Sequence, residues 1–236
     1  HFQGIKESPD EAIERIDDIG GPHSHTNYPW GWAQCGNSPF RWYKTLTHEG
    51  GVHVPMVVHW PAGLGDAAGT KRNQFAYVAD IVPTVYEILG ITAPDTHRGI
   101  QQMPVTGHSF ASVLDDADAP ATNRLQYFEF GGNRALIVER DGVWWKAVTR
   151  HLPGADFDTE PWELFDLTAD PSECHDLADT QPDRLAELID LWWQEAETHG
   201  VLPLDERRLE LFIPRLDDHS VHRSDRRYIY RPPMTP

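Results

Sequence analysis

The chain has 236 residues, which is enough for one large domain or for a domain with a smaller appendage. Its 20 Lys and Arg residues stand against 37 Asp and Glu residues, and the net charge of −17 argues against nucleic acid and against an anionic membrane as partners. No apolar run approaches the roughly 20 residues of a membrane span. The two cysteines, Cys35 and Cys174, match no zinc, redox or disulfide pattern, so the compartment stays open, with the cytoplasm slightly favoured over export.

Two stretches precede the first strongly apolar segment. Residues 8–17 are charged and compatible with a helix, and a proline suits its first position, so we predict a short surface helix. Residues 20–40 are rich in Gly, Pro and aromatic residues, and we predict no regular element there. His23, His25 and Cys35 are of types that bind zinc, but their spacing resembles no structural zinc site, and we assign no metal ligand to this chain.

A polar cluster then leads into the most strand-like segment of the chain. Lys44, His48 and Glu49 come before the double glycine Gly50-Gly51, which we expect to allow positive φ angles or a close approach of a ligand. Residues 52–60 read as a buried strand interrupted by a proline. A lysine here suits an oxyanion, because its ammonium is a compact charge with three donors, and a neutral His48 could protonate a leaving group or orient a ligand. The alternative is a solvated lysine and a histidine that is hydrogen-bonded in a turn.

A helix with one apolar face follows the next Gly-rich loop. Asp80 is its predicted N-cap, and Gly90 is its predicted end. A buried strand followed by such a helix is the repeating unit of an α/β layer. The long connection over residues 91–124 holds a candidate hinge at residues 114–122.

Beyond the hinge the pattern changes to alternating apolar and polar residues. Four runs predict strands of an antiparallel sheet with one covered face, and Asp141-Gly142 predicts a type I′ hairpin. Residues 182–198 predict the covering helix, with a capping box from Thr180 and Asp183 and a Trp pair used in packing. The four runs are residues 125–130, 135–140, 143–148 and 163–167.

These patterns divide the chain into three parts. Residues 1–114 form an α/β part, residues 123–203 a small domain with an antiparallel sheet and a helix, and residues 204–236 an arm rich in Arg, Tyr and Pro. In so acidic a chain, we expect the arm to dock on its own α/β part or on a second subunit, which would give a homo-oligomer.

Four segments resemble type I sulfatases, formylglycine-dependent members of the alkaline-phosphatase-like superfamily, and stand in that family's order. Lys44-x-x-x-x-Glu49-Gly50-Gly51, before a Pro-containing strand, resembles the segment in which a sulfatase lysine contacts the sulfate ester. Residues 19–40 are similar to the larger bacterial arylsulfatases in particular. The other two segments are Asp80-Ile81-Val82-Pro83-Thr84 and Glu163-Leu164-Phe165-Asp166-Leu167 with Asp170-Pro171-x-Glu173.

The resemblance implies the C-terminal part of an alkaline-phosphatase-like α/β sandwich followed by a small α+β domain, in which a helix covers a four-stranded antiparallel sheet. It implies a sulfatase, a sulfuric ester hydrolase for aryl or similar small-molecule sulfate esters, in which Lys44 is a substrate-binding and catalytic residue. His48 is our second catalytic candidate, from its position beside the double glycine. Because the ester is an anion and the chain is acidic, we expect local cations to dominate the field at the site.

The family's nucleophile, a formylglycine, is made within Cys/Ser-x-Pro/Ala-x-Arg, and this motif is absent from the chain. Ser109-Phe110-Ala111 comes nearest, but Val113 stands where arginine is required. We therefore expect the formylglycine, and a divalent metal (Ca²⁺ or another), on a missing N-terminal part of the catalytic domain that precedes His1. The chain alone should be inactive.

Two other functions stay open. Phosphatases and phosphonate monoester hydrolases share the superfold, and a lysine with a metal serves phosphoryl as well as sulfuryl transfer. The nucleophile motif upstream would distinguish them. A stand-alone, non-catalytic binding domain is the third reading, which the folding behaviour of the chain by itself would test.

Overall fold

The computed structural model describes residues 9–14, 16–18, 28 and 30–206. Helix α1 (Pro9–Glu14) begins at its proline, as predicted. The absence of a regular element over residues 20–40 was a wrong prediction for helix α2 (Trp30–Gly36), whose glycines stand near its two ends and leave room for a short helix. His23, His25 and residues 207–236 of the arm lie outside the described residues.

Four strands form the main sheet, in the order β3-β4-β5-β6, and each neighbour is antiparallel. All four predicted strands are confirmed within two residues. Asp141 and Gly142 have φ angles of 54° and 81°, as a type I′ turn requires, so the predicted hairpin is confirmed too. The strands are β3 (Leu125–Phe130), β4 (Asn133–Arg140), β5 (Val143–Thr149) and β6 (Glu163–Asp166).

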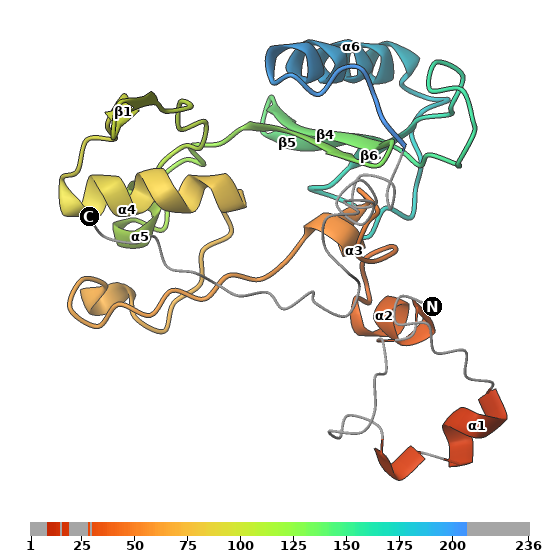
Figure 1. The fold of residues 1–236 in the computed structure, drawn as a ribbon, viewed down its shortest axis with the longest axis horizontal. Helices are drawn as coiled ribbons and strands as arrows, with labels where there is room; N and C mark the ends of the chain where they lie inside the picture. Colours follow the sequence, from red (N-terminus) through yellow and green to blue (C-terminus); the bar gives the residue numbers. More distant parts are fainter. Residues whose placement is uncertain (1–8, 15, 19–27, 29, 207–236) are drawn as a thin grey trace, which may run out of the picture.

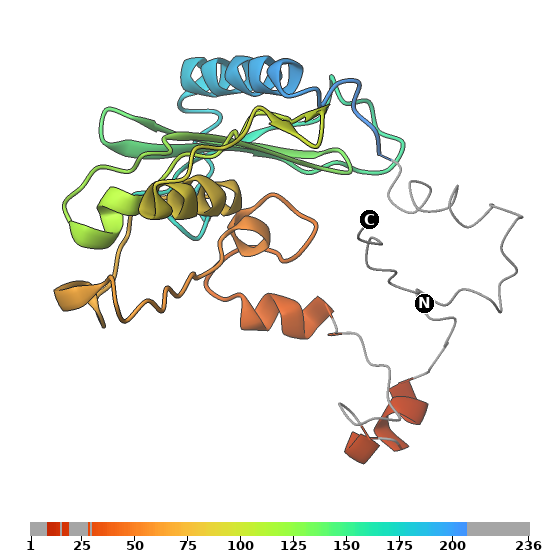
Figure 2. The same cartoon turned by 60° about the vertical axis from the view of Figure 1, so that its left-hand side comes forward.

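Helix α6 (Pro182–Thr198) covers one face of this sheet, as predicted (Figures 1 and 2). Its buried residues pack on alternate residues of the strands and form the main core. Trp192 packs as predicted, and its indole N–H donates to the carbonyl of Phe128 at 3.0 Å. The capping box was wrong: Gln181 stands at the N-cap, and the hydroxyl of Thr180 donates to the carbonyl of Leu177 at 3.1 Å.

The opposite face of the sheet is covered as well. Helix α3 (Glu49–Val52) and the chain around it lie on that face, below the sheet in Figures 1 and 2. We predicted one covered face from the alternation of apolar and polar residues, and the second face does carry the polar side chains of Lys146 and Glu163. Both meet polar groups of the segment around α3.

The predicted buried strand over residues 52–60 is not formed among the described residues. The segment is extended beyond Val52 but pairs with no described strand, and Val57 is 91% exposed. A strand needs a neighbour to satisfy its backbone groups, and none of the described strands lies beside it.

Helix α4 (Ile81–Leu89) begins after Asp80 and ends at Gly90, whose φ is 64°, as predicted. Asp80 occupies the N-cap position, but its side chain makes no capping hydrogen bond to the helix. Its carboxylate instead accepts from the backbone N–H of Tyr77 and of His108, at 2.7 and 2.8 Å. The predicted apolar face is largely exposed. Its exposed residues are Ile81, Val82, Val85 and Leu89.

Between α4 and the sheet, the chain forms the short strands β1 (Thr96–His97) and β2 (Ile100–Gln101), which pair with each other, and then helix α5 (Ala111–Asp115).

Within the part of the chain that is described, no helix combines the length and apolar character needed to cross a membrane. Cys35 and Cys174 are both free and exposed.

Candidate active-site turn

Lys44 lies on a tight turn, residues 41–48, between α2 and α3, and we call these residues the site turn. Its side chain is exposed. The turn folds back on α3, since the N–H of Gly50 donates to the carbonyl of Arg41 at 2.8 Å and the N–H of Leu46 donates to that of Tyr43 at 3.2 Å.

The double glycine is explained by this packing. Neither Gly50 nor Gly51 has a positive φ, contrary to one of our two expectations. A Cβ on Gly50 would collide with the carbonyl oxygens of Arg41 and Trp42, and one on Gly51 with that of Leu46. The close approach at the double glycine is therefore made by the backbone of the site turn, whereas we had expected a ligand there.

His48 is buried below the turn, with 1% of its surface exposed. Its Nε2 lies 3.0 Å from Oε2 of Glu163, and the other oxygen of Glu163 accepts from Arg41 at 3.0 Å. The hydrogen bond from His48, together with the bond and charge of Arg41, outweighs the effect of burial and lowers the pKa of Glu163. The structure thus separates the two predicted site residues: Lys44 faces outward, and His48 ties the turn to strand β6.

A buried charge cluster lies next to His48 and joins α3 to the sheet. Its buried members are Glu49, Lys146 and Glu173, and the half-exposed His53 joins it from the surface. The ammonium of Lys146 lies 2.8 Å from Oε1 of Glu49 and 2.9 Å from Oε1 of Glu173. Glu173 also accepts from the backbone N–H of Glu49 at 2.9 Å, so two carboxylates share one buried cation at the start of α3.

The charges in this cluster shift the titration of Glu49. Burial by itself would raise the pKa of Glu49, but the charge of Lys146 and the hydrogen bonds from His53 and Lys146 outweigh it and lower the pKa to about 2. Glu49 therefore stays ionised and holds His53, whose Nδ1 is 2.8 Å from its Oε2. That hydrogen bond raises the pKa of His53 against the opposing effect of burial.

His53 is the residue that sequence reasoning missed. Its side chain is 50% exposed, and its ring stacks on Phe40 at 4.5 Å between centroids. The spacing of Glu49 and His53, four residues apart across one helical turn, was the available signal. Lys146 and Glu173 carry no comparable signal, because they are distant in sequence.

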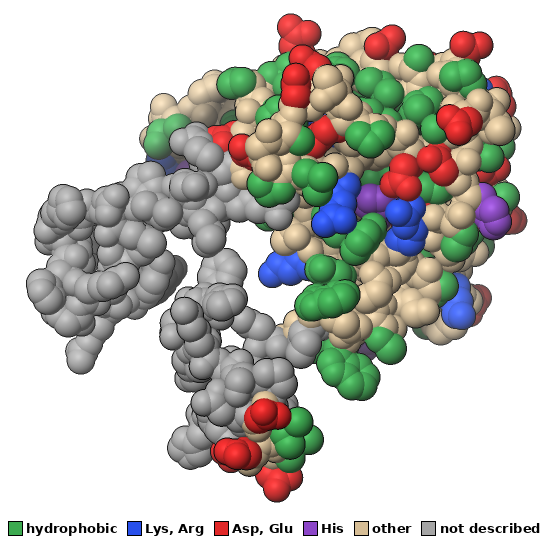
Figure 3. Space-filling view, turned by 90° about the vertical axis from the view of Figure 1, so that its right-hand side faces the viewer, with side chains coloured by type: hydrophobic (Ala, Val, Ile, Leu, Met, Phe, Trp, Pro, Cys, Tyr) green, Lys and Arg blue, Asp and Glu red, His purple; other side chains and the backbone are tan. Residues whose placement is uncertain are grey.

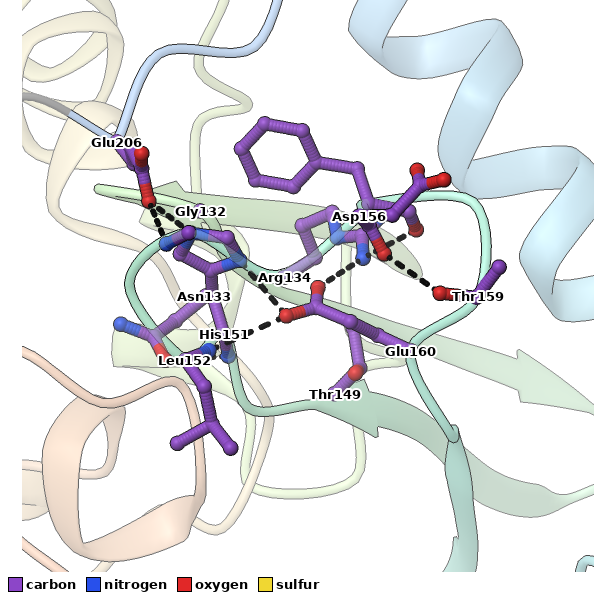
Figure 4. A network of polar contacts seen from close by, with 12 residues as sticks. Gly132, Asn133, Arg134, Thr149, His151, Leu152, Asp156, Thr159, Glu160 and Glu206 are labelled. Atoms are coloured by element: carbon purple, nitrogen blue, oxygen red, sulfur yellow. Dashed lines mark hydrogen bonds and ion pairs between the residues drawn. The ribbon is translucent and has the colours of Figure 1, made fainter.

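A second polar network lies at the same end of the sheet (Figure 4). His151 is buried between Glu160, at 2.7 Å from Nδ1, and Glu206, at 2.8 Å from Nε2. Glu160 also accepts from Arg134 at 2.7 Å, and the carbonyl of Arg134 accepts from the hydroxyl of Thr47 in the site turn at 3.2 Å. This network therefore supports the site turn from the sheet.

Arg134 is buried on the α6 face of the sheet. Its guanidinium carbon lies 5.1–5.7 Å from the centroids of four aromatic rings, close enough for cation–π attraction. Burial lowers the pKa of Arg134, although the charge of Glu160 opposes this. The four rings belong to Phe157, Trp162, Trp192 and Trp193.

Positive charge collects locally in spite of the acidic composition. In the face drawn in Figure 3, Lys and Arg side chains gather around a histidine in the middle, while Asp and Glu side chains lie mostly above them.

No three or more His, Cys, Asp or Glu side chains within the described ranges are arranged to hold a metal ion, so these residues do not fit a metal centre.

Residues 38–195 match the family described as N-sulphoglucosamine sulphohydrolase, C-terminal. The matched range includes the site turn, α3, the main sheet and nearly all of α6, which places the chain among the sulfatases. The chain belongs to this family, and it corresponds to the C-terminal portion of a sulfatase, as the sequence resemblance implied.

Curated relatives support this assignment. A sulfatase of Schizosaccharomyces pombe is 29% identical over 81% of this chain and 33% of its own length. Arylsulfatase K of Xenopus laevis is 26% identical over 63% of this chain and 26% of its own length. Human arylsulfatase D is 28% identical over 57% of this chain and 25% of its own length. The chain thus spans about a quarter to a third of these relatives.

Two solved structures share the fold. One, from a study of the metabolism of multiple glycosaminoglycans by Bacteroides thetaiotaomicron, covers 79% of this chain and 35% of its own, with a TM-score of 0.51 and 19% identity. The crystal structure of Ps i-CgsB covers 80% of this chain and 38% of its own, with a TM-score of 0.50 and 21% identity. The predicted fold of a sulfatase C-terminal portion, with a four-stranded antiparallel sheet and a covering helix, is confirmed.

Proposed function

We propose that this chain is the C-terminal part of a type I, formylglycine-dependent sulfuric ester hydrolase of the bacterial arylsulfatase kind, which cleaves aryl or similar sulfate esters, and that Lys44 contacts the ester. The observation that carries the proposal is the exposed Lys44 on a turn that is tied to the sheet, in a chain of the sulfatase family. The formylglycine and a divalent metal, Ca²⁺ or another, belong to the preceding part of the catalytic domain.

The role of Lys44 follows from the charge of the reaction. When a sulfuryl group is transferred, negative charge moves onto the leaving oxygen, and a fixed ammonium facing that oxygen stabilises the transition state. The formylglycine, as a hydrate, supplies the attacking oxygen. The described residues of this chain offer no ligand set for a metal, so in this proposal the divalent metal is held by the preceding part of the catalytic domain.

His48 acts on the turn rather than on the ester in this proposal. It is buried and bonded to Glu163, which leaves its ring no access to a ligand on the outer surface. We revise its role from proton donor to support for the turn that carries Lys44.

The exposed apolar surface supports the proposal that a larger catalytic domain is completed upstream. Residues 54–60 are extended and exposed, and the outer face of α4 exposes Val82, Val85 and Leu89. Exposed apolar surface that is grouped on a segment or a helix face marks an interaction site. In this proposal, the preceding part of the catalytic domain pairs with residues 54–60 and covers that face of α4.

The test uses the full-length protein. We expect Lys44→Ala to lower turnover of 4-nitrophenyl sulfate by about 10²- to 10³-fold. Lys71→Ala, which removes another exposed lysine of the same chain, is the matched control and should leave turnover unchanged. Near-normal turnover by Lys44→Ala would contradict the proposal, and faster cleavage of 4-nitrophenyl phosphate than of the sulfate would favour phosphoryl transfer instead.

A further inference from the structure

The site turn holds two residues other than glycine in the left-handed region of φ. Trp42 has a φ of 63° and Thr45 a φ of 79°, so they flank Lys44 closely on both sides. Threonine is β-branched, and this conformation is a genuine outlier for such a residue. Backbone of this kind persists only where its surroundings hold it in place, and it is found mostly at functional sites.

Two side-chain amides hold the carbonyl groups of these two residues. The Asn37 amide donates to the carbonyl of Trp42 at 2.9 Å and to that of Gly50 at 2.7 Å. The Asn133 amide donates to the carbonyl of Thr45 at 3.1 Å. Each unusual residue of the turn thus has its own amide donor, one from the end of α2 and one from the start of β4.

Asn133 is itself fixed on every side. It is fully buried, its amide also donates to the carbonyl of Phe130 at 3.0 Å, and its carbonyl oxygen accepts from the N–H of His151 at 3.1 Å. In Figure 4 it lies beside His151 in the network that includes Glu160. A donor held in this way cannot follow the turn if the turn relaxes.

We propose that Asn133 and Asn37 are positioning residues for the reaction, which act by holding the flanks of Lys44 in the left-handed conformation that aims its ammonium at the ester. This inference rests on the proposed role of Lys44. In this proposal the main sheet affects the rate of ester cleavage through Asn133, which lies 89 positions after Lys44 in the chain.

The contacts distinguish this role from general support of the fold. Asn123 is also buried, and its amide lies 3.3 Å from Asp80 and 3.4 Å from Gln126, away from the site turn. Asn123→Ala is therefore a matched control: it removes a buried amide of the same kind but touches no residue that flanks Lys44.

The experiment is a double-mutant cycle in the full-length protein with 4-nitrophenyl sulfate. We expect Asn133→Ala to lower kcat by about tenfold, the loss of about one hydrogen bond, with a smaller change in KM. In the Lys44→Ala background, Asn133→Ala should cause no further loss, because it acts through Lys44. Asn123→Ala should lower the thermal midpoint but leave kcat within about twofold.

A rescue variant probes the conformation directly. Glycine adopts a positive φ at no steric cost, so Thr45→Gly should restore part of the kcat lost in Asn133→Ala. If Asn133→Ala does not fold, Asn37→Ala, at a half-buried residue, takes its place in the cycle with the same expectation.

Equal losses of kcat in the wild-type and Lys44→Ala backgrounds would overturn the positioning role while leaving Lys44 in the site. A wild-type kcat for Asn133→Ala or Asn37→Ala would overturn it for that residue. Full activity of Lys44→Ala itself would instead remove the proposed function on which the inference rests.

Discussion

The main sheet and the segment from His53 to Gly90 both contain strongly apolar sequence but bury it very differently. In the sheet and its covering helix α6, Leu136, Ala147 and Leu188 are fully buried, and even the charged second face of the sheet is covered by α3. In the other segment, Val57 is 91% and Leu89 61% exposed. The sheet therefore carries its own stabilising contacts, whereas the segment leaves much of its apolar surface exposed among the described residues.

The largest expected loss of stability comes from removing the buried cation on the second face of the sheet. Lys146→Met should lower the free energy of unfolding by about 3–5 kcal/mol, because Glu49 and Glu173 would remain buried without their shared cation. Chemical denaturation of the chain measures the loss. Lys71→Met, at an exposed lysine, should change stability by less than about 0.5 kcal/mol. A cost below about 1 kcal/mol for Lys146→Met would mean that the cluster is open to water.

A matched pair of substitutions compares the two regions with the same chemistry. Leu188→Ala in α6 should cost about 2–5 kcal/mol, since this leucine is fully buried in the main core. Leu89→Ala in α4 should cost less than about 0.5 kcal/mol in the chain alone. In the full-length protein we expect Leu89→Ala to become clearly destabilising. Equal costs for Leu89→Ala in the two proteins would contradict the proposed covering of α4.

A smaller effect appears in the pH dependence of the charge cluster. The folded pKa of Glu49 is about 2 and its ordinary value is 4.5, so its stabilisation is complete well above pH 4.5 and is lost as pH falls from 4.5 toward 2. Between pH 7 and pH 3 this amounts to about 2 kcal/mol. The stability difference between wild type and Glu49→Gln should shrink by that amount.

Glu87→Gln is the control substitution, because Glu87 is exposed on α4. At pH 7 its stability should differ from that of the wild type by less than about 0.5 kcal/mol. A Glu49→Gln difference that is as large at pH 3 as at pH 7 would show that the ionisation of Glu49 does not stabilise the fold.

Local sequence patterns predicted the sheet and α6 correctly, because the spacing of apolar residues in each element matches the spacing of its buried positions. Alternation gave the four strands, Asp141-Gly142 gave the hairpin, and the 3.6-residue period gave the helix over residues 182–198. Residues 52–60 have the same apolar signal, but a strand also needs a neighbour, and periodicity does not reveal whether one is present.

Only the local part of the candidate site could be predicted from the sequence, for a related reason. Lys44 and the double glycine form a local motif, but the contacts that hold them come from Asn133, Lys146 and Glu173, far along the chain. A local pattern cannot show which of several polar residues on a strand will be buried against a distant turn. The sequence left His48 open between a group that acts on a ligand and a histidine hydrogen-bonded in a turn, because its partner Glu163 is distant in the sequence.

Hydrogen exchange on the isolated chain tests the central contrast most directly. Amides of β3, β4, β5 and α6 should exchange slowly, because they are bonded within the sheet and the helix. Amides of residues 54–60 donate no backbone hydrogen bond to any described residue and should exchange fast. In the full-length protein the same amides should become slow. Slow exchange of residues 54–60 in the chain alone, matching that of β4, would contradict the account, because the segment would then have its partners within this chain.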